Sequence, residues 1–124
     1  MRGTLAVMLA AGVLGGCASA GGFPKSLPME SSNTIAQATQ AIADARTAGA
    51  DSLASEALSN AKMHLDQAQN EQVLRHVDQA TLHAREALAD ARLARTTALR
   101  MKAEHEQAAA QSALSALPQN GGSR

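Results

Sequence analysis

Between residues 73 and 101 the sequence reads VLRHVDQATLHAREALADARLARTTALRM. Apolar residues, most of them alanine, recur in it at alternating spacings of four and three: Val73, Val77, Ala80, Ala84, Ala87, Ala91, Ala94, Ala98 and Met101. This is the 3.5-residue repeat of helices that pack along a coiled-coil-like seam. Alanine is the best helix former, and its small side chain lets helix backbones approach closely. We therefore predict an all-α fold with an alanine-rich seam.

Two stripes of the same kind precede this segment. They are Ile35, Ala38, Ile42 and Ala45, and then Ala54, Leu58, Ala61, Leu65 and Ala68. Gly49 separates the two and should end the first helix. We expect caps from polar side chains at the start of each helix, from Ser31, Ser32 or Asn33 for the first and from Asp51 or Ser52 for the next.

The second and third stripes are out of phase by one residue. The slip falls in the all-polar segment 69–72, where we predict a turn between two antiparallel helices. The alternative is one long helix with a skip residue. The domain prediction is then three helices within residues 31–117, a short first helix plus an antiparallel helical hairpin, followed by a disordered tail at 118–124.

The N-terminus has the features of an export signal. Arg2 is followed by an apolar run at residues 5–13, which is shorter than the roughly 20 residues that a bilayer span needs. Leu14, Gly15, Gly16 and Cys17 match the lipobox of bacterial lipoproteins. We therefore predict a signal peptide at residues 1–16 and a covalent diacylglycerol and N-acyl lipid on Cys17.

Residues 17–30 contain glycine, proline and serine, and should form a disordered linker between lipid and domain. Ala18 after the cysteine favours sorting to the outer membrane. The alternative is ordinary cleavage after Ala18-Ser19-Ala20, which would release a soluble periplasmic adaptor that binds a membrane complex.

The composition argues against several functions. Lys+Arg and Asp+Glu both number 11, and aromatic residues make up 1% of the chain, so neither the charge nor the stacking platform of a nucleic-acid binder is present. The one cysteine is assigned to the lipid, and no histidine and acid are placed to activate a serine. We expect no enzyme activity and no small-molecule substrate.

Four histidines raise the question of a metal site. His76, His83 and Asp90 share one helix face at spacings of seven, which corresponds to about 10 Å of rise and is too long for one ion. His64 and His105 would complete a site only through a fold that the sequence does not establish. We therefore expect solvated histidines and no metal.

Arg85, Arg92 and Arg100 form a stripe at spacings of seven and eight, away from the alanine seam. The stripe is a candidate contact with an anionic surface, such as lipid headgroups or cell-wall carboxylates. The alternative is a solvated helix face.

Three segments resemble a family of bacterial envelope lipoproteins known as a domain of unknown function. They are AIADARTAGAD at 41–51, then Leu58, Ala61, Lys62, Leu65 and Ala68, and finally Ala84 with EALADARLA at 86–94. The resemblance covers about residues 35–98 and implies a helical module that often precedes an OmpA-like domain, although we expect none here. The family often has Tyr and Pro where this chain has residues 52–55, and Gly where it has Gln69 and Asn70.

The sequence thus predicts a lipid-anchored helical lipoprotein at the bacterial outer membrane, facing the periplasm. Its expected partners are membrane lipid through Cys17, and an envelope protein or a second copy of the chain.

Overall fold

The structure is a computed structural model and describes residues 27–118. Helices account for most of this range, and no strand occurs in it: α1 (Pro28–Thr47), α2 (Ala50–Leu53), α3 (Ser55–Val73) and α4 (Val77–Ser115). The predicted all-α fold is confirmed, with a first helix followed by a helical hairpin. The one-turn helix α2 is an addition to the prediction. None of the helices within residues 27–118 combines the length and the apolar character needed to cross a bilayer.

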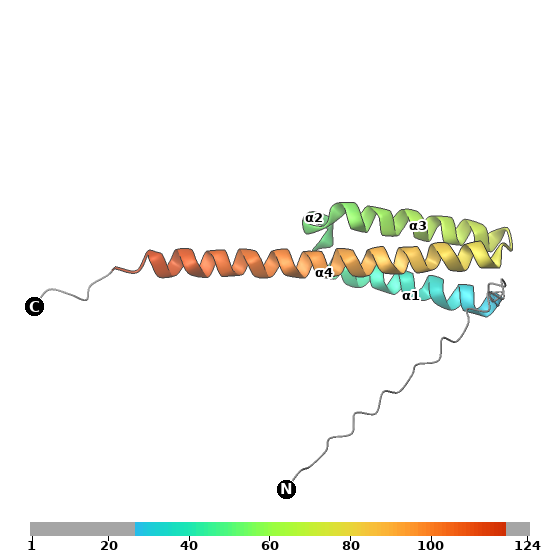
Figure 1. The fold of residues 1–124 in the computed structure, drawn as a ribbon, viewed down its shortest axis with the longest axis horizontal. Helices are drawn as coiled ribbons and strands as arrows, with labels where there is room; N and C mark the ends of the chain where they lie inside the picture. The colour runs from blue at the N-terminus through green and yellow to red at the C-terminus, as the bar shows by residue number, and fades with distance from the viewer. Residues whose placement is uncertain (1–26, 119–124) are drawn as a thin grey trace, which may run out of the picture.

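Figure 1 shows α1, α3 and α4 side by side as an elongated bundle. Helices α1 and α4 start at the same end and run in the same direction, whereas α3 runs the opposite way. The α3–α4 turn therefore lies beside the start of α1. Helix α4 packs against both other long helices, and then continues beyond them as a single helix.

The core is the predicted seam. Six alanines of α4 have no exposed surface: Ala80, Ala84, Ala87, Ala91, Ala94 and Ala98. The predicted stripe of α1 is also buried, from Ile35 to Ala45, and in α3 Leu58 is the largest fully buried side chain. Because an alanine methyl buries little area, the seam contributes less hydrophobic free energy than a core of large side chains. Val73 does not belong to the seam, since it ends α3 with 82% of its surface exposed.

Helix α1 begins three residues earlier than predicted. Pro28 is its first residue, a favourable position because proline lacks the N–H that would stay unpaired there. The expected caps are wrong, because Ser31, Ser32 and Asn33 all lie inside the helix and no side chain caps it. The hydroxyls of Ser31 and Ser32 both donate to the carbonyl of Pro28. The backbone N–H groups of Glu30 and Ser31 donate instead to the carbonyl of Leu27.

Gly49 ends the first helical segment, as predicted, with a left-handed φ of 94°. The expected caps on the next helix are not formed, because α2 starts at Ala50 and no side chain caps it. Asp51 has a different role: its carboxylate lies 3.5 Å from Arg46 of α1 and 3.7 Å from Lys62 of α3. These exposed ion pairs connect α2 to both neighbouring helices.

The turn between α3 and α4 lies later than predicted. Helix α3 continues through the polar segment 69–72 to Val73, and the chain reverses at residues 74–76. The N–H of His76 donates to the carbonyl of Glu71, and that of Arg75 to the carbonyl of Gln72. This pair of bonds is the Schellman motif, with Arg75 left-handed at φ 63°. The alternative of one continuous helix is therefore wrong.

Candidate functional site

The predicted lipidation site lies outside the described residues. Cys17 and the lipobox residues Leu14, Gly15 and Gly16 all precede residue 27, and residues 119–124 of the predicted tail are also outside. Among the described residues, Leu27 at the start of α1 is closest in sequence to Cys17. The surface at this end of the bundle is therefore the first candidate site.

Apolar side chains are exposed at the end where α1 starts. Leu27 and Met29 are 68% and 76% exposed. Val73 and Leu74, at the neighbouring α3–α4 turn, are 82% and 60% exposed. We call these four residues the basal patch. Single exposed apolar residues are common, so their grouping at one end of the bundle is what makes them a candidate site.

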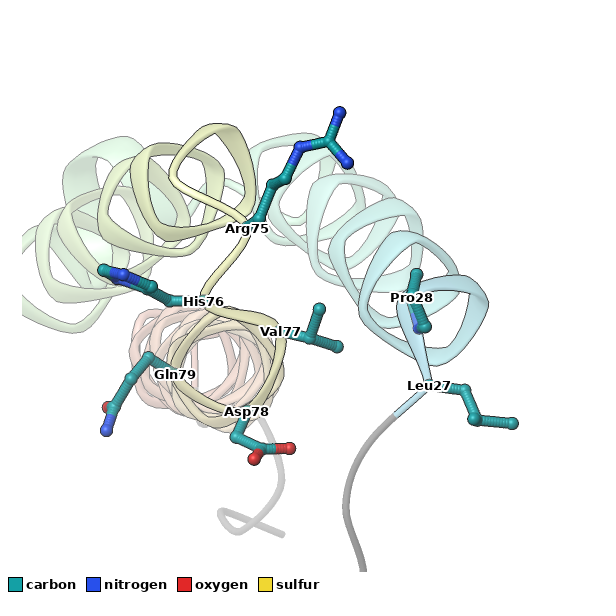
Figure 2. Close-up of a pocket in the computed structure, with 7 residues that line it drawn as sticks. All are labelled: Leu27, Pro28, Arg75, His76, Val77, Asp78 and Gln79. Atoms are coloured by element: carbon teal, nitrogen blue, oxygen red, sulfur yellow. The ribbon is translucent and has the colours of Figure 1, made fainter.

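An open hollow lies between the start of α1 and the α3–α4 turn, and Leu27 of the basal patch is one of its lining residues (Figure 2). Its volume is about 590 Å³, and it is lined by Leu27, Pro28, Arg75, His76, Val77, Asp78 and Gln79. Val77 points toward α1, whereas Arg75 extends away from α4. The side chain of His76 turns back to α3, where its Nδ1 lies 2.7 Å from Glu71 Oε2. The hollow thus belongs to the same end of the bundle as the exposed apolar residues.

Two polar contacts tie α1 to the other helices near this end. Gln72 at the end of α3 donates to the hydroxyl of Ser32 at 2.8 Å. Arg85 of α4 donates to the carboxylate of Glu30 in α1. Arg85 therefore already has an acidic partner within the protein.

All three arginines of the predicted stripe are exposed. Arg92 lies beside a hollow of about 340 Å³ between α1 and α4, together with Arg95 and Asp44. Arg100 lies 3.8 Å from Glu104, four residues later in the same helix. Two of the three arginines, Arg85 and Arg100, thus form ion pairs with glutamates of the same protein. Contact with an anionic surface stays a prediction.

The opposite end of the molecule is the free segment of α4. Every residue from 102 to 115 is exposed, although the helix continues unbroken to Ser115. Leu114 and Leu117 near its end are 68% and 61% exposed. These 14 residues correspond to about 21 Å of helix without a neighbour among residues 27–118.

A group of titratable side chains lies where α3 packs on α4. His64 of α3 faces three residues of α4, which are His83, Glu86 and Asp90. The His64 and His83 rings are stacked, with centroids 6.1 Å apart and an interplanar angle of 15°. Both imidazoles are only about a quarter exposed, at 25% and 26%. We call these four residues the histidine–carboxylate cluster.

The carboxylate of Glu86 joins the two imidazoles. Its Oε2 lies 2.9 Å from Nδ1 of His83 and 3.3 Å from Nδ1 of His64. On the other side of the His64 ring, Nε2 lies 3.6 Å from Oδ2 of Asp90. Gln67 adds a polar contact, since its Oε1 is 3.2 Å from His64 Nδ1. Both nitrogens of His64 therefore face oxygen atoms.

Sequence reasoning placed His83 and Asp90 on one helix face, but it missed their neighbours. His64 comes from the other helix of the hairpin, and His76 lies at the turn, away from this group. His105 is exposed on the free segment of α4. A signal was present: His64, His83 and Asp90 each directly precede a seam residue and so flank the helix interface.

A family comparison covers most of the described residues. A family model described as Domain of unknown function (DUF4398) matches residues 33–120 of the 124. The chain belongs to this family. No curated protein and no solved structure matches it.

The DUF4398 match includes all of α3 and α4 and most of α1, but neither Cys17 nor Leu27. The histidine–carboxylate cluster and the three arginines thus lie within it. The resemblance to a domain of unknown function is confirmed. Membership of an envelope lipoprotein family stays a prediction from the lipobox.

Proposed function

We propose that this DUF4398 chain is a lipid-anchored module of the bacterial outer membrane that faces the periplasm. Its role is structural or protein-binding, and it has no catalytic activity. The lipobox before Cys17 supports the anchor. The observation that carries the proposal is the basal patch, because its exposed apolar residues lie at the end of the bundle where the chain leads back to Cys17.

The chain length between anchor and bundle limits their separation. Nine residues lie between Cys17 and Leu27, so the two are ten residue steps apart, and a fully extended chain over ten steps reaches about 35 Å. The end of the bundle with the basal patch is thus the end that a lipid on Cys17 holds closest to the membrane. Exposed leucine, methionine and valine side chains there gain free energy by leaving water for the interface between headgroups and acyl chains.

The free segment of α4 supports a role in binding another protein. An isolated helix of about 14 residues is marginally stable in water, even when it is rich in alanine. The packed part of α4 helps to hold the segment helical, and a second helix along it would stabilise it further. With the basal patch at the membrane, the free segment points to the other end of the molecule, where an envelope protein or another copy of the chain is accessible.

The anchor is tested first. Cells expressing the chain are labelled with radioactive palmitate, and the mature protein is analysed by mass spectrometry. We expect palmitate label on the chain that retains Cys17 and none on the Cys17→Ala variant. An unlabelled protein that begins after Ala20 would contradict the anchor and support the soluble adaptor instead.

The orientation is tested with the mature lipidated chain in phospholipid vesicles. An environment-sensitive fluorescent amino acid replaces either Leu74 or Leu114, which are similarly exposed at 60% and 68%. We expect a lipid-soluble quencher to reduce the emission at position 74 and to leave that at position 114 unchanged. Equal quenching at the two positions would show that the basal patch does not face the lipid.

The binding role is tested in cells with a photo-crosslinking amino acid at Leu114 of the free segment. The matched control position is Leu93, which is 57% exposed but lies on the bundle. We expect a specific crosslinked product from position 114 only, and its mass and peptides distinguish a second copy from another envelope protein. Identical products, or no product, at both positions would contradict binding through the free segment.

A further inference from the structure

We propose that His64, His83 and Glu86 bind a divalent transition-metal ion, and that the ion links α3 to α4. One imidazole nitrogen from each histidine and one carboxylate oxygen of Glu86 all lie within 4.8 Å of one another. Metal binding by these residues would be a property separate from the proposed membrane anchoring, and it does not depend on the anchor. The proposal depends on the chemistry of the three donors, on their spacing and on the residue behind them.

The donor types select the class of ion. Neutral imidazole and carboxylate together suit zinc and the neighbouring first-row metals, whereas calcium and magnesium prefer sites made of oxygen alone. Glu86 and Asp90 carry two negative charges that balance the charge of the ion. Three protein ligands leave one position of a four-coordinate ion for water.

The spacing of the donors fits one ion. Ligand atoms about 2.0–2.1 Å from a tetrahedral ion are separated from one another by roughly 3.4 Å. The observed separations from Glu86 Oε2 are 2.9 Å to His83 Nδ1 and 3.3 Å to His64 Nδ1. His83 and Glu86 are three residues apart in one helix, where side chains converge. The third separation, between the two imidazole nitrogens, is no more than 4.8 Å. Binding of an ion therefore requires the two rings to turn until these nitrogens are about 3.4 Å apart.

Asp90 acts as a positioning residue. Its carboxylate lies 3.6 Å from Nε2 of His64, on the side of the ring opposite Glu86. This distance is longer than a hydrogen bond, so Asp90 acts on His64 through its charge. A negative charge on that side of the ring favours the proton on Nε2 and leaves the lone pair of Nδ1 for the ion. Gln67, whose Oε1 contacts the same Nδ1, would be displaced by the ion. This arrangement of carboxylate, imidazole and metal is frequent in zinc proteins.

The two helices give the ion a mechanical effect. His64 belongs to α3, and the other two ligands belong to α4, so a bound ion adds a connection across the hairpin. Since the ligands are brought together only by folding, binding favours the folded state. The added stability matters in a bundle whose core consists mainly of alanine.

The test uses the full chain with Cys17→Ala, which removes the one thiol, and with no affinity tag left on the protein. Isothermal titration calorimetry measures Zn²⁺ binding. We expect one ion per chain and a melting temperature that rises by several degrees with Zn²⁺ and falls again with EDTA. His64→Gln and His83→Gln should each weaken the affinity by at least about a hundredfold, and Asp90→Asn by about tenfold.

The matched control is His105→Gln, on the free segment of α4, which should bind like the unmodified chain. The proposal is overturned by the absence of stoichiometric Zn²⁺ binding, by binding that persists in His64→Gln and His83→Gln, or by equal loss in His105→Gln. Far-UV circular dichroism checks that each variant is helical. Cobalt(II) added to the chain with intact histidines gives a readout that needs no further variant: visible absorption of a four-coordinate ion is expected, and the spectrum of hexaaquo cobalt would overturn the proposal.

Discussion

Gly49 and Arg75 are the two residues between 27 and 118 with positive φ, and they precede and follow α3. Each allows the chain to leave a long helix and reverse its direction. Gly49 has φ 94° after α1, and Arg75 has φ 63° after α3. Both residues adopt a left-handed backbone conformation. Glycine is well suited to it, whereas the Cβ atom of Arg75 makes it unfavourable. Replacing the glycine should therefore destabilise the fold, and introducing a glycine in place of Arg75 should stabilise it.

We expect Gly49→Ala to lower the free energy of unfolding by about 1 kcal/mol. The cause is the backbone, since an added Cβ would meet only Leu53 Cδ1 at an ordinary 3.8 Å. Gly49→Asn is the control, because asparagine tolerates left-handed φ better and should cost less. Urea unfolding followed by circular dichroism measures the difference. Equal losses for alanine and asparagine would show that strain at this φ is not the cause.

We expect Arg75→Gly to raise the free energy of unfolding by a few tenths to about 1 kcal/mol, since it removes the cost of a side chain at left-handed φ. The greater freedom of glycine in the unfolded chain limits this gain. The control is Arg95→Gly in the exposed middle of α4, which should lose about 1 kcal/mol by helix propensity. Thermal unfolding of the two variants checks the sign. A loss at both positions would contradict the prediction.

The first of these turns could be located from the sequence and the second could not, because different residues form them. Gly49 stands between two apolar stripes, so the first turn could be found. Arg75 carries no such signal, and the polar residues 69–72 suggested a turn that lies instead at 74–76. Residues 69–72 instead form the last turn of α3, near the end of the bundle, where few neighbours require apolar side chains. Polarity indicated exposure there, but not the end of the helix.

The seam could be predicted in detail, whereas the histidine–carboxylate cluster could not. Periodicity along one helix fixes which alanines share a face, and the structure buries those of α4 from Ala80 to Ala98. Which residue of α3 lies opposite His83 depends on the register of the hairpin. That register depends on where the turn is, and the predicted turn was five residues too early at its start. His64 could therefore not be placed beside His83 from the sequence.

Leu58 should be more important for stability than any exposed leucine. It is 1% exposed and lies in a cluster with Ala91, Ala94 and Ala98. Leu58→Ala should lower the free energy of unfolding by about 2–5 kcal/mol, through lost burial and the cavity left behind. Leu93→Ala, at a site 57% exposed, should change it by less than about 0.5 kcal/mol. Urea titration compares the two variants, and similar midpoints would contradict the assignment of Leu58 to the core.

The closest packing is expected at the alanines of α4, and overfilling one of them tests it. Ala91 has no exposed surface and belongs to the cluster that includes Ile42 of α1 and Leu58 of α3. Ala91→Leu inserts three carbon atoms where the helices have little space, so one neighbouring helix must move outward. We expect a loss of about 1–3 kcal/mol in the free energy of unfolding.

The matched variant is Ala103→Leu, which makes the same change on the exposed, free segment of α4. Its melting temperature should remain close to that of the unmodified chain, because no helix among residues 27–118 packs against that position. Thermal unfolding by circular dichroism compares the two variants, both of which keep a good helix former. If Ala91→Leu melted at the same temperature as Ala103→Leu, the helices could not be packed as closely along α4 as the buried alanines indicate.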